Sequence, residues 1–155
     1  MYYFSYGSFL DSDTLRKHCP SAKFVTRAIL PDYEVKFNFM SNTYKAGVTG
    51  VEVRVGKNTH GVVYELPLKE IEYLDLIEGV PEGDYFRQTV EVVDDEGKSF
   101  QVEIYRTSNP KGPFQSNRTY VIKMLNGARE HSLAPEYIKE LEDLYQTLPE
   151  GLIYG

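Results

Sequence analysis

The chain has 155 residues, of which 41% are hydrophobic and 26% charged, and this length and composition fit one globular domain, residues 1–155. Its 17 basic and 23 acidic side chains give a net charge of -6, and no basic run suggests a nucleic-acid partner. One cysteine and three scattered histidines exclude an internal disulfide and give no metal-binding signature. Without a basic leader, or an apolar run near the roughly 18 residues of a membrane span, no membrane association is expected and the predicted location is cytoplasmic.

The first part of the chain predicts a strand, a tight loop and a helix. Residues 2–6 are aromatic and polar in a strand-like order, Gly7 and Ser8 interrupt them, and residues 11–15 have the acidic and serine residues of a helix start. Over residues 33–39 apolar side chains alternate with polar ones, which predicts a strand with one face in water.

The middle of the chain predicts further strands around one helix. Separate strands are expected over residues 51–55 and 61–66, and an amphipathic helix over residues 66–77. Residues 85–93 and 100–105 form the next pair of strands, joined by a turn rich in acidic residues and glycine.

The last part of the chain predicts two helices. Ser116 and Asn117 can cap a helix with apolar residues at Tyr120, Val121, Met124 and Leu125. Pro135 follows Ala134 at the start of the final helix. The elements do not alternate regularly between strand and helix. The expected fold class is therefore α+β: a small mixed, mainly antiparallel sheet, closed as a barrel, with about four helices around it.

One carboxylate stands in an unusual place. Counting from Ile71 through Leu74 at helical spacing reaches Glu78, which continues the apolar stripe into the last turn of the predicted helix. Burial and the negative end of the helix dipole both favour the protonated form of such a carboxyl, as a general acid/base requires. The alternative is an exposed structural acid, since carboxylates on helices are usually solvated and Asp75 lies near the same arc.

The loop at residues 6–10 joins a strand to a helix start through Gly7. A glycine in this position lets several backbone N–H groups point the same way, and such a nest can hold a carboxylate. The same residues also fit an ordinary turn glycine followed by a capping serine. The spacing matches neither a P-loop nor a dinucleotide fingerprint.

Several short motifs together resemble the gamma-glutamylcyclotransferase family. They are Tyr-Gly-Ser at residues 6–8, Pro-Ser-Ala-Lys-Phe at 20–24, Gly-Val-Val-Tyr-Glu-Leu at 61–66, Leu-Asp-Leu-Ile-Glu-Gly-Val at 74–80, Tyr85, Tyr105, Tyr120, Asn-Gly-Ala-Arg-Glu at 126–130 and Leu-Ala-Pro-Glu-Tyr at 133–137. Their order and spacing follow the family over nearly the whole chain.

The resemblance implies a small barrel with helices around it, usually a homodimer, that uses no metal or cofactor. It also implies an enzyme that cleaves a small gamma-glutamyl substrate by intramolecular attack and releases 5-oxoproline with a free amine or amino acid. Carried over by position, the acid/base is Glu78. The implied substrate-binding residues are Tyr6, Gly7, Ser8, Phe9 and Leu10 of the loop, with Tyr85, Tyr105 and, allowing one inserted residue, Tyr120.

One departure from the family pattern concerns substrate choice. Where the family commonly has Asn after Tyr-Gly-Ser, this chain has Phe9, which cannot donate the amide hydrogen bond. A gamma-glutamylamine or another gamma-glutamyl metabolite is therefore an alternative substrate. A non-catalytic protein that binds gamma-glutamyl or other anionic ligands is the alternative of another class.

Overall fold

The computed structural model describes residues 1–151. Five strands close into a barrel in the order β1-β3-β2-β4-β5. The strands are β1 Tyr2–Ser5, β2 Lys23–Ser41, β3 Ala46–Glu65, β4 Tyr85–Val93 and β5 Ser99–Thr107. Neighbouring strands are antiparallel except β1 and β5, which pair in parallel and close the barrel. The expected mixed, mainly antiparallel barrel is confirmed.

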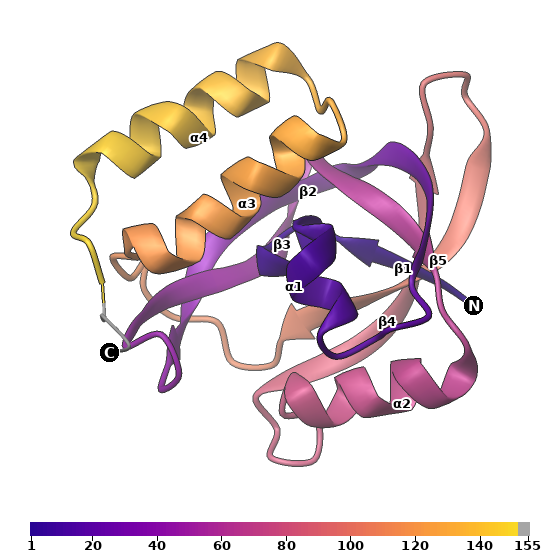
Figure 1. Ribbon diagram of the computed structural model, residues 1–155, viewed down its shortest axis with the longest axis horizontal. Coiled ribbons are helices and arrows are strands. Elements are labelled where there is room, and N and C mark those ends of the chain that lie inside the picture. Colours follow the sequence, from indigo (N-terminus) through magenta and orange to yellow (C-terminus); the bar gives the residue numbers. More distant parts are fainter. Residues whose placement is uncertain (152–155) are drawn as a thin grey trace.

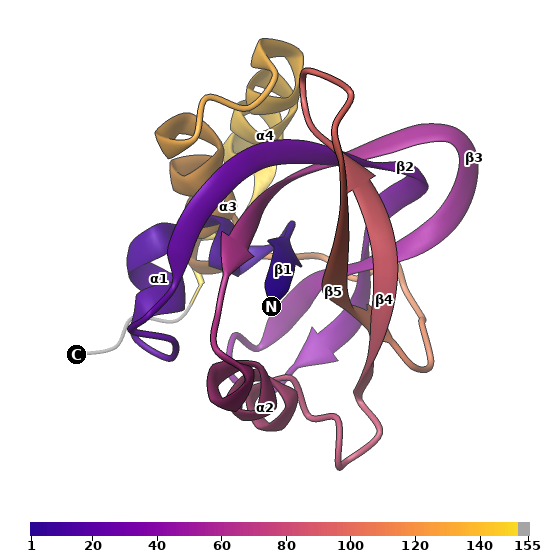
Figure 2. The same ribbon diagram turned by 90° about the vertical axis from the view of Figure 1, so that its right-hand side faces the viewer.

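Short and long helices surround the barrel on different sides. They are the 3₁₀ turn η1 Ser8–Leu10 and the α-helices α1 Ser12–Arg16, α2 Leu68–Ile77, α3 Arg118–Glu130 and α4 Pro135–Thr147. Helices α3 and α4 lie together on one side, α2 lies apart from them at the bottom of both views, and α1 sits between these groups (Figures 1 and 2). Asn117 caps α3 by accepting a hydrogen bond from the N–H of Tyr120 at 3.0 Å, as its sequence predicts.

Strands β2 and β3 are longer than the sequence pattern predicts. The two strands expected over residues 51–55 and 61–66 are parts of the single strand β3, which bends around the barrel beside β2 (Figure 2). Their pairing contains register shifts, including one between Pro31 and Tyr33, and such irregularities let long strands curve. Gly56, between those two predicted strands, lies within β3 at a φ of +88°.

The polar face expected for the strand over residues 33–39 is only partly in water: the side chains of Lys36 and Glu34 are 43% and 21% exposed, but that of Asn38 is buried. Asn38 is only 2% exposed. Its amide accepts a hydrogen bond from the hydroxyl of Thr107 at 2.6 Å and donates one to the carboxylate of Glu52 at 3.0 Å. The polar side chain is therefore satisfied by neighbouring strands instead of water.

The apolar residues form two cores, and the site lies beside one of them. Strand residues such as Phe4, Val63 and Val102 form a cluster of the barrel itself. A second cluster joins the barrel to the helices and includes Leu10 and Leu74. This division follows the two-residue period of a strand, which sends alternate side chains to opposite faces of the sheet.

Candidate active site

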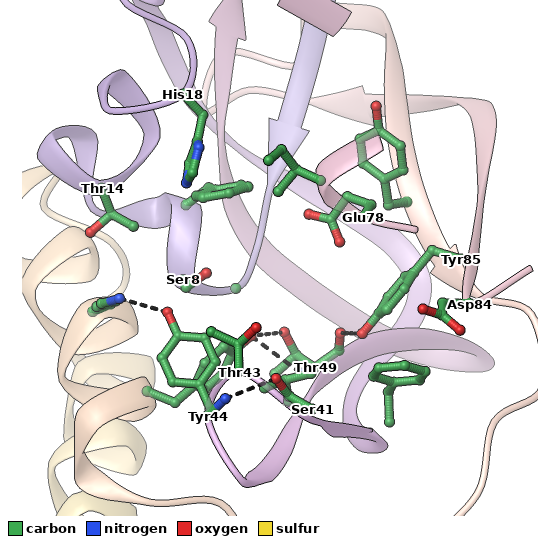
Figure 3. A pocket seen from close by; sticks show the side chains of 18 of the residues that line it. Ser8, Thr14, His18, Ser41, Thr43, Tyr44, Thr49, Glu78, Asp84 and Tyr85 are labelled. Atoms are coloured by element: carbon green, nitrogen blue, oxygen red, sulfur yellow. Dashed lines mark hydrogen bonds between the residues drawn. The ribbon is translucent and has the colours of Figure 1, made fainter. Parts of the chain in front are cut away.

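A single cavity brings together segments from all parts of the sequence. Its volume is about 560 Å³, within the range of roughly 300 to 1,000 Å³ that small-molecule sites occupy. The loop at η1, the turn between β2 and β3, the end of α2, the first residues of β4 and one face of α3 contribute to its lining. Figure 3 shows that Ser8 and Glu78 both face this space, from different elements.

Glu78 is placed in the cavity by the way α2 ends. It is the C-cap of the helix, and Gly79 follows with a φ of +74°. The N–H of Gly79 donates to the carbonyl of Leu76 at 3.2 Å and that of Val80 to the carbonyl of Asp75 at 2.9 Å. These two hydrogen bonds form a Schellman motif, which needs a residue with positive φ after the cap and turns the chain sharply.

The carboxyl of Glu78 has an unusual environment. Burial alone raises its pKa from 4.5 to about 7, because desolvation disfavours the charged form. No hydrogen bond or ion pair joins this carboxyl to another residue in the part of the chain described. The group is thus a carboxyl that both gains and loses a proton near neutral pH and is free to meet a ligand in the cavity.

Four residues of the loop at 6–10 line the cavity, and the fifth is buried in the core. Tyr6, Gly7, Ser8 and Phe9 line the cavity. Leu10, which the sequence assigned to the same binding loop, is fully buried in the core between the barrel and the helices and does not line the cavity. Because the chain tightens into a 3₁₀ turn here, with the N–H of Leu10 donating to the carbonyl of Gly7 at 3.0 Å, the Leu10 side chain points away from the loop's open side.

Gly7 is required by a close approach to two neighbours. A Cβ at this position would lie 2.5 Å from Thr49 Oγ1 and 2.8 Å from the hydroxyl oxygen of Tyr120. These two contacts leave no space for a side chain at this position. The absence of a side chain is what brings the loop backbone against the cavity wall.

Tyr85 and Tyr120 are held in the wall through one residue, Thr49. The hydroxyl of Tyr85 donates to the backbone carbonyl of Thr49 at 2.7 Å. The hydroxyl of Tyr120 accepts from the Thr49 N–H at 3.2 Å and shares a hydrogen bond with Thr49 Oγ1 at 2.6 Å. Burial raises the pKa of Tyr120 to about 12 and that of Tyr85 further, so both phenols are neutral.

Tyr6 and Tyr105 contribute to the wall with their hydroxyls already engaged. The hydroxyl of Tyr6 donates to the backbone carbonyl of Tyr105. The hydroxyl of Tyr105 donates to Asp75 at 2.6 Å, with the carbonyl of Ile71 as a second acceptor at 3.2 Å, and neither of these residues lines the cavity. Tyr105 therefore supplies an aromatic surface to the cavity while its polar end fastens α2 to the barrel.

Asp75, which shares an arc of the helix with Glu78, has a different environment. It accepts hydrogen bonds from Arg87 Nε at 2.9 Å and from the hydroxyl of Tyr105. The carboxylate of Asp75 therefore pairs with a cationic side chain, unlike that of Glu78. Although Asp75 and Glu78 lie near the same arc of the helix, their carboxylates have different environments in the folded chain.

Comparison with known proteins agrees over most of the chain. The model of the AIG2-like family matches residues 58–141. The gamma-glutamylcyclotransferase of Mus musculus is 33% identical over 156 residues, covering 97% of this chain and 82% of the relative. The Bos taurus enzyme is 32% identical over 147 residues, covering 92% of this chain and 77% of the relative. A solved structure named gamma-glutamyl cyclotransferase superposes with a TM-score of 0.89 at 27% identity, covering 100% of this chain and 91% of that one.

The chain belongs to the gamma-glutamylcyclotransferase family. It is an enzyme of this type, and the barrel with surrounding helices is the gamma-glutamylcyclotransferase fold. Within residues 1–151, no helix is long and apolar enough to cross a membrane. Over the same residues, no three histidine, cysteine, aspartate or glutamate side chains are grouped as metal ligands.

Sequence reasoning misses several residues of this gamma-glutamylcyclotransferase cavity. They are Tyr3, Thr14, Lys17, His18, Thr49, Asp84 and Lys123, together with residues 41–44 of the turn between β2 and β3. Only Asp84 had a usable signal, because it lies directly before Tyr85 and close in sequence to Glu78. The others belong to no local motif, and they meet only because the barrel closes.

Cys19 lies in the apolar core between the barrel and the helices. The side chain is fully buried, and burial raises the pKa of the thiol to about 12. A thiol with this pKa is not ionised at neutral pH, so Cys19 does not serve as a nucleophile. Cys19, the single cysteine of the chain, packs in the core and does not line the cyclotransferase cavity.

Proposed function

We propose that this enzyme cleaves small gamma-glutamyl compounds by cyclisation, releasing 5-oxoproline and a free amino acid or amine, with Glu78 as general acid/base. One observation carries the proposal: the unpaired carboxyl of Glu78, whose pKa is raised to about 7, opens on the same cavity as Gly7 and Ser8. The mouse and bovine relatives are named for the same reaction.

The reaction requires proton movement between two nitrogens. The α-amino group of the glutamyl part enters as an ammonium and must lose a proton before its lone pair can attack the γ-carbonyl carbon. The ionised Glu78 accepts that proton, and the protonated Glu78 then donates to the departing nitrogen as the original amide bond breaks. In total two protons leave the attacking nitrogen and two reach the leaving nitrogen, so atoms and charge balance.

The remaining cavity residues position the substrate. Because the ring closes within one molecule, the enzyme chiefly has to hold the glutamyl chain folded and keep water away from it. Backbone N–H groups of Gly7 and Ser8 hold an anionic oxygen, either the α-carboxylate or the scissile carbonyl as it develops charge. The hydroxyl oxygens of Tyr6 and Tyr85 already donate to the protein, which leaves them lone pairs to accept from the ammonium.

The test is turnover by the purified protein. Incubation with gamma-glutamyl-alanine should release 5-oxoproline and alanine in equal amounts. Glu78→Gln keeps the shape of the side chain but cannot exchange a proton, and should lower kcat at least about 100-fold, the scale of general acid/base catalysis. Glu72→Gln, on an exposed position of the same helix, is the matched control and should retain full activity. Retained activity in Glu78→Gln would refute the mechanism.

A further inference from the structure

The charged residues of the cavity are separated into two groups. In Figure 3, Glu78 and Asp84 lie near Tyr85 to the right of Ser8, whereas Thr14 lies to its left and Tyr44, below Ser8, points its hydroxyl to that second side. Lys123 belongs to this second side, because its ammonium donates a hydrogen bond to the hydroxyl of Tyr44 at 2.6 Å. The cavity thus has an acidic end and a basic end, with the loop at Gly7 and Ser8 between them.

The ammonium of Lys123 is held in position by Tyr44 but has no carboxylate partner among the described residues. Lys123 projects from α3 and lines the cavity, and its Nζ lies 4.8 Å from the centre of the Tyr44 ring as well as bonding to the hydroxyl. It forms no ion pair with any residue between 1 and 151. Only one of its three donors is used within the described chain, and two remain for a ligand in the cavity. Lys17, exposed at the end of α1, lines the same space and is likewise not ion-paired there.

A gamma-glutamyl-amino acid carries three charged groups: the α-ammonium and α-carboxylate of the glutamyl part, and the carboxylate of the leaving amino acid. The acidic end at Glu78 suits the ammonium, and the loop N–H groups suit the first carboxylate. The basic end then remains for a second carboxylate, beyond the scissile bond. A gamma-glutamylamine has no group to place there.

We propose that Lys123, anchored by Tyr44, is a specificity-determining residue of this cavity: its ammonium binds the carboxylate of the leaving amino acid, a group that a gamma-glutamylamine lacks. Lys17 adds a second positive charge to the lining of the same cavity. This inference rests on the proposed function, since it assigns a role in substrate choice to a residue of the same cavity. It also selects between the two substrate classes that Phe9 left open.

The experiment compares two substrates that differ only in the carboxylate. Gamma-glutamyl-alanine and gamma-glutamyl-ethylamide have the same glutamyl part and the same two-carbon leaving group. A hydrogen-bonded charge pair contributes enough binding energy for the unmodified enzyme to prefer the alanine compound by about 10- to 100-fold in kcat/KM. Equal kcat/KM values, or a preference for the ethylamide, would overturn the proposal.

Substitutions at Lys123 test whether this residue causes the preference for gamma-glutamyl-alanine over the ethylamide. Lys123→Met should lower kcat/KM for gamma-glutamyl-alanine by about 10-fold or more and leave the ethylamide reaction unchanged, which also shows that the variant is folded. Lys123→Arg should restore most of the preference. Lys139→Met removes the same charge from α4, outside the cavity, and should change neither reaction. Equal losses on both substrates would mean that Lys123 serves the glutamyl part, and would contradict the assignment.

A binding measurement tests the role of Lys123 independently of whether the protein catalyses the proposed reaction. In the Glu78→Gln background, calorimetry should show gamma-glutamyl-alanine binding more tightly than the ethylamide, and the addition of Lys123→Met should remove the difference. This result stands even if the protein releases no 5-oxoproline from either compound, in which case the proposed function fails alone. Equal binding of both compounds would overturn the inference, whether or not the enzyme is active.

Discussion

Tyr85 donates a hydrogen bond from its hydroxyl to the backbone carbonyl of Thr49 at 2.7 Å, across the wall of the cavity. The same threonine bonds to Tyr120 through both its N–H and its side chain. One residue of β3 therefore sets the positions of a tyrosine on β4 and a tyrosine on α3. The shape of the site depends on this contact as much as on the residues that face the substrate.

The Thr49 and Tyr120 hydroxyls should be energetically coupled. Thr49→Val and Tyr120→Phe each remove one partner of a buried hydrogen bond, and we expect each to lower the free energy of unfolding by about 1 to 2 kcal/mol. In urea denaturation, the double variant should lose less than the sum of the single variants, by about 0.5 to 1.5 kcal/mol.

The control for this cycle pairs Thr49→Val with Thr147→Val on α4, where the threonine hydroxyl bonds only to its own helix. These two effects should add. Additivity in the Thr49 and Tyr120 pair as well would show that the short contact contributes nothing to stability.

The pH dependence of kcat/KM should report the titration of Glu78. The proposed base must be ionised to accept the substrate proton, so kcat/KM should rise with pH and level off above an inflection near pH 7, where the pKa of this carboxyl lies. The measurement is kcat/KM for gamma-glutamyl-alanine between pH 5 and 8. An inflection near the ordinary carboxyl value would exclude Glu78 in this environment as the group that limits activity.

Stability should depend on the same titration with the opposite sign. A raised pKa means that the native state binds the proton more tightly than the unfolded chain does, so Glu78 stabilises the fold below about pH 4.5 and this contribution is lost as the pH rises through about 7. Glu78→Gln stays neutral throughout. Relative to the unmodified protein it should therefore gain about 2 to 3 kcal/mol in free energy of unfolding between pH 4.5 and pH 8.

This gain is measured by urea denaturation at both pH values, and Glu72→Gln should show no such gain. If Glu78→Gln is no more stable than the unmodified protein at pH 8, the carboxyl is not desolvated in solution. If Glu78→Gln is both more stable and inactive, the carboxyl of Glu78 lowers the stability of the fold and is required for activity.

Gly7→Ala should damage both stability and activity. The added methyl group would meet Thr49 Oγ1 and the Tyr120 hydroxyl, and overpacking of this kind costs about 1 to 3 kcal/mol. We expect kcat/KM to fall at least about 10-fold, because the displaced tyrosine and loop both line the cavity. Thr49→Ala in the same chain removes the nearest obstructing atom and should restore part of the stability.

Gly97→Ala provides the comparison for this prediction. Gly97 has a φ of +81° in the turn between β4 and β5, and nothing lies within 4 Å of the added Cβ. Its cost is backbone strain alone, so it should lower stability without changing kcat/KM. Full activity in Gly7→Ala would mean that the loop tolerates displacement from the wall.

The sequence indicates the parts of the site whose causes are local. The stripe from Ile71 through Leu74 places Glu78 on the apolar side of a helix, and Gly79 marks the position where that helix ends. Both follow from the helical period and the left-handed conformation that glycine accepts. The cap at Asn117 and the pairing of β4 with β5 are equally local, and both are confirmed.

The pattern fails where distant segments decide the outcome. The two strands read at residues 51–55 and 61–66 are one strand, because pairing with β2 continues past Gly56. Leu10 leaves the binding loop for the core because α3 packs against η1 and supplies an apolar environment for it. No single stretch of sequence contains either fact.

By itself the sequence determined the mixed barrel with helices, the family resemblance, and a carboxylate at the end of an apolar helix face. The tertiary structure alone decided which groups share a cavity with that carboxylate. Tyr44 and Lys123 are 79 positions apart and form a basic end only because the barrel brings the β2–β3 turn beside α3. Helix period and turn chemistry act over a few residues, whereas the charge arrangement of a pocket depends on closure of the whole sheet.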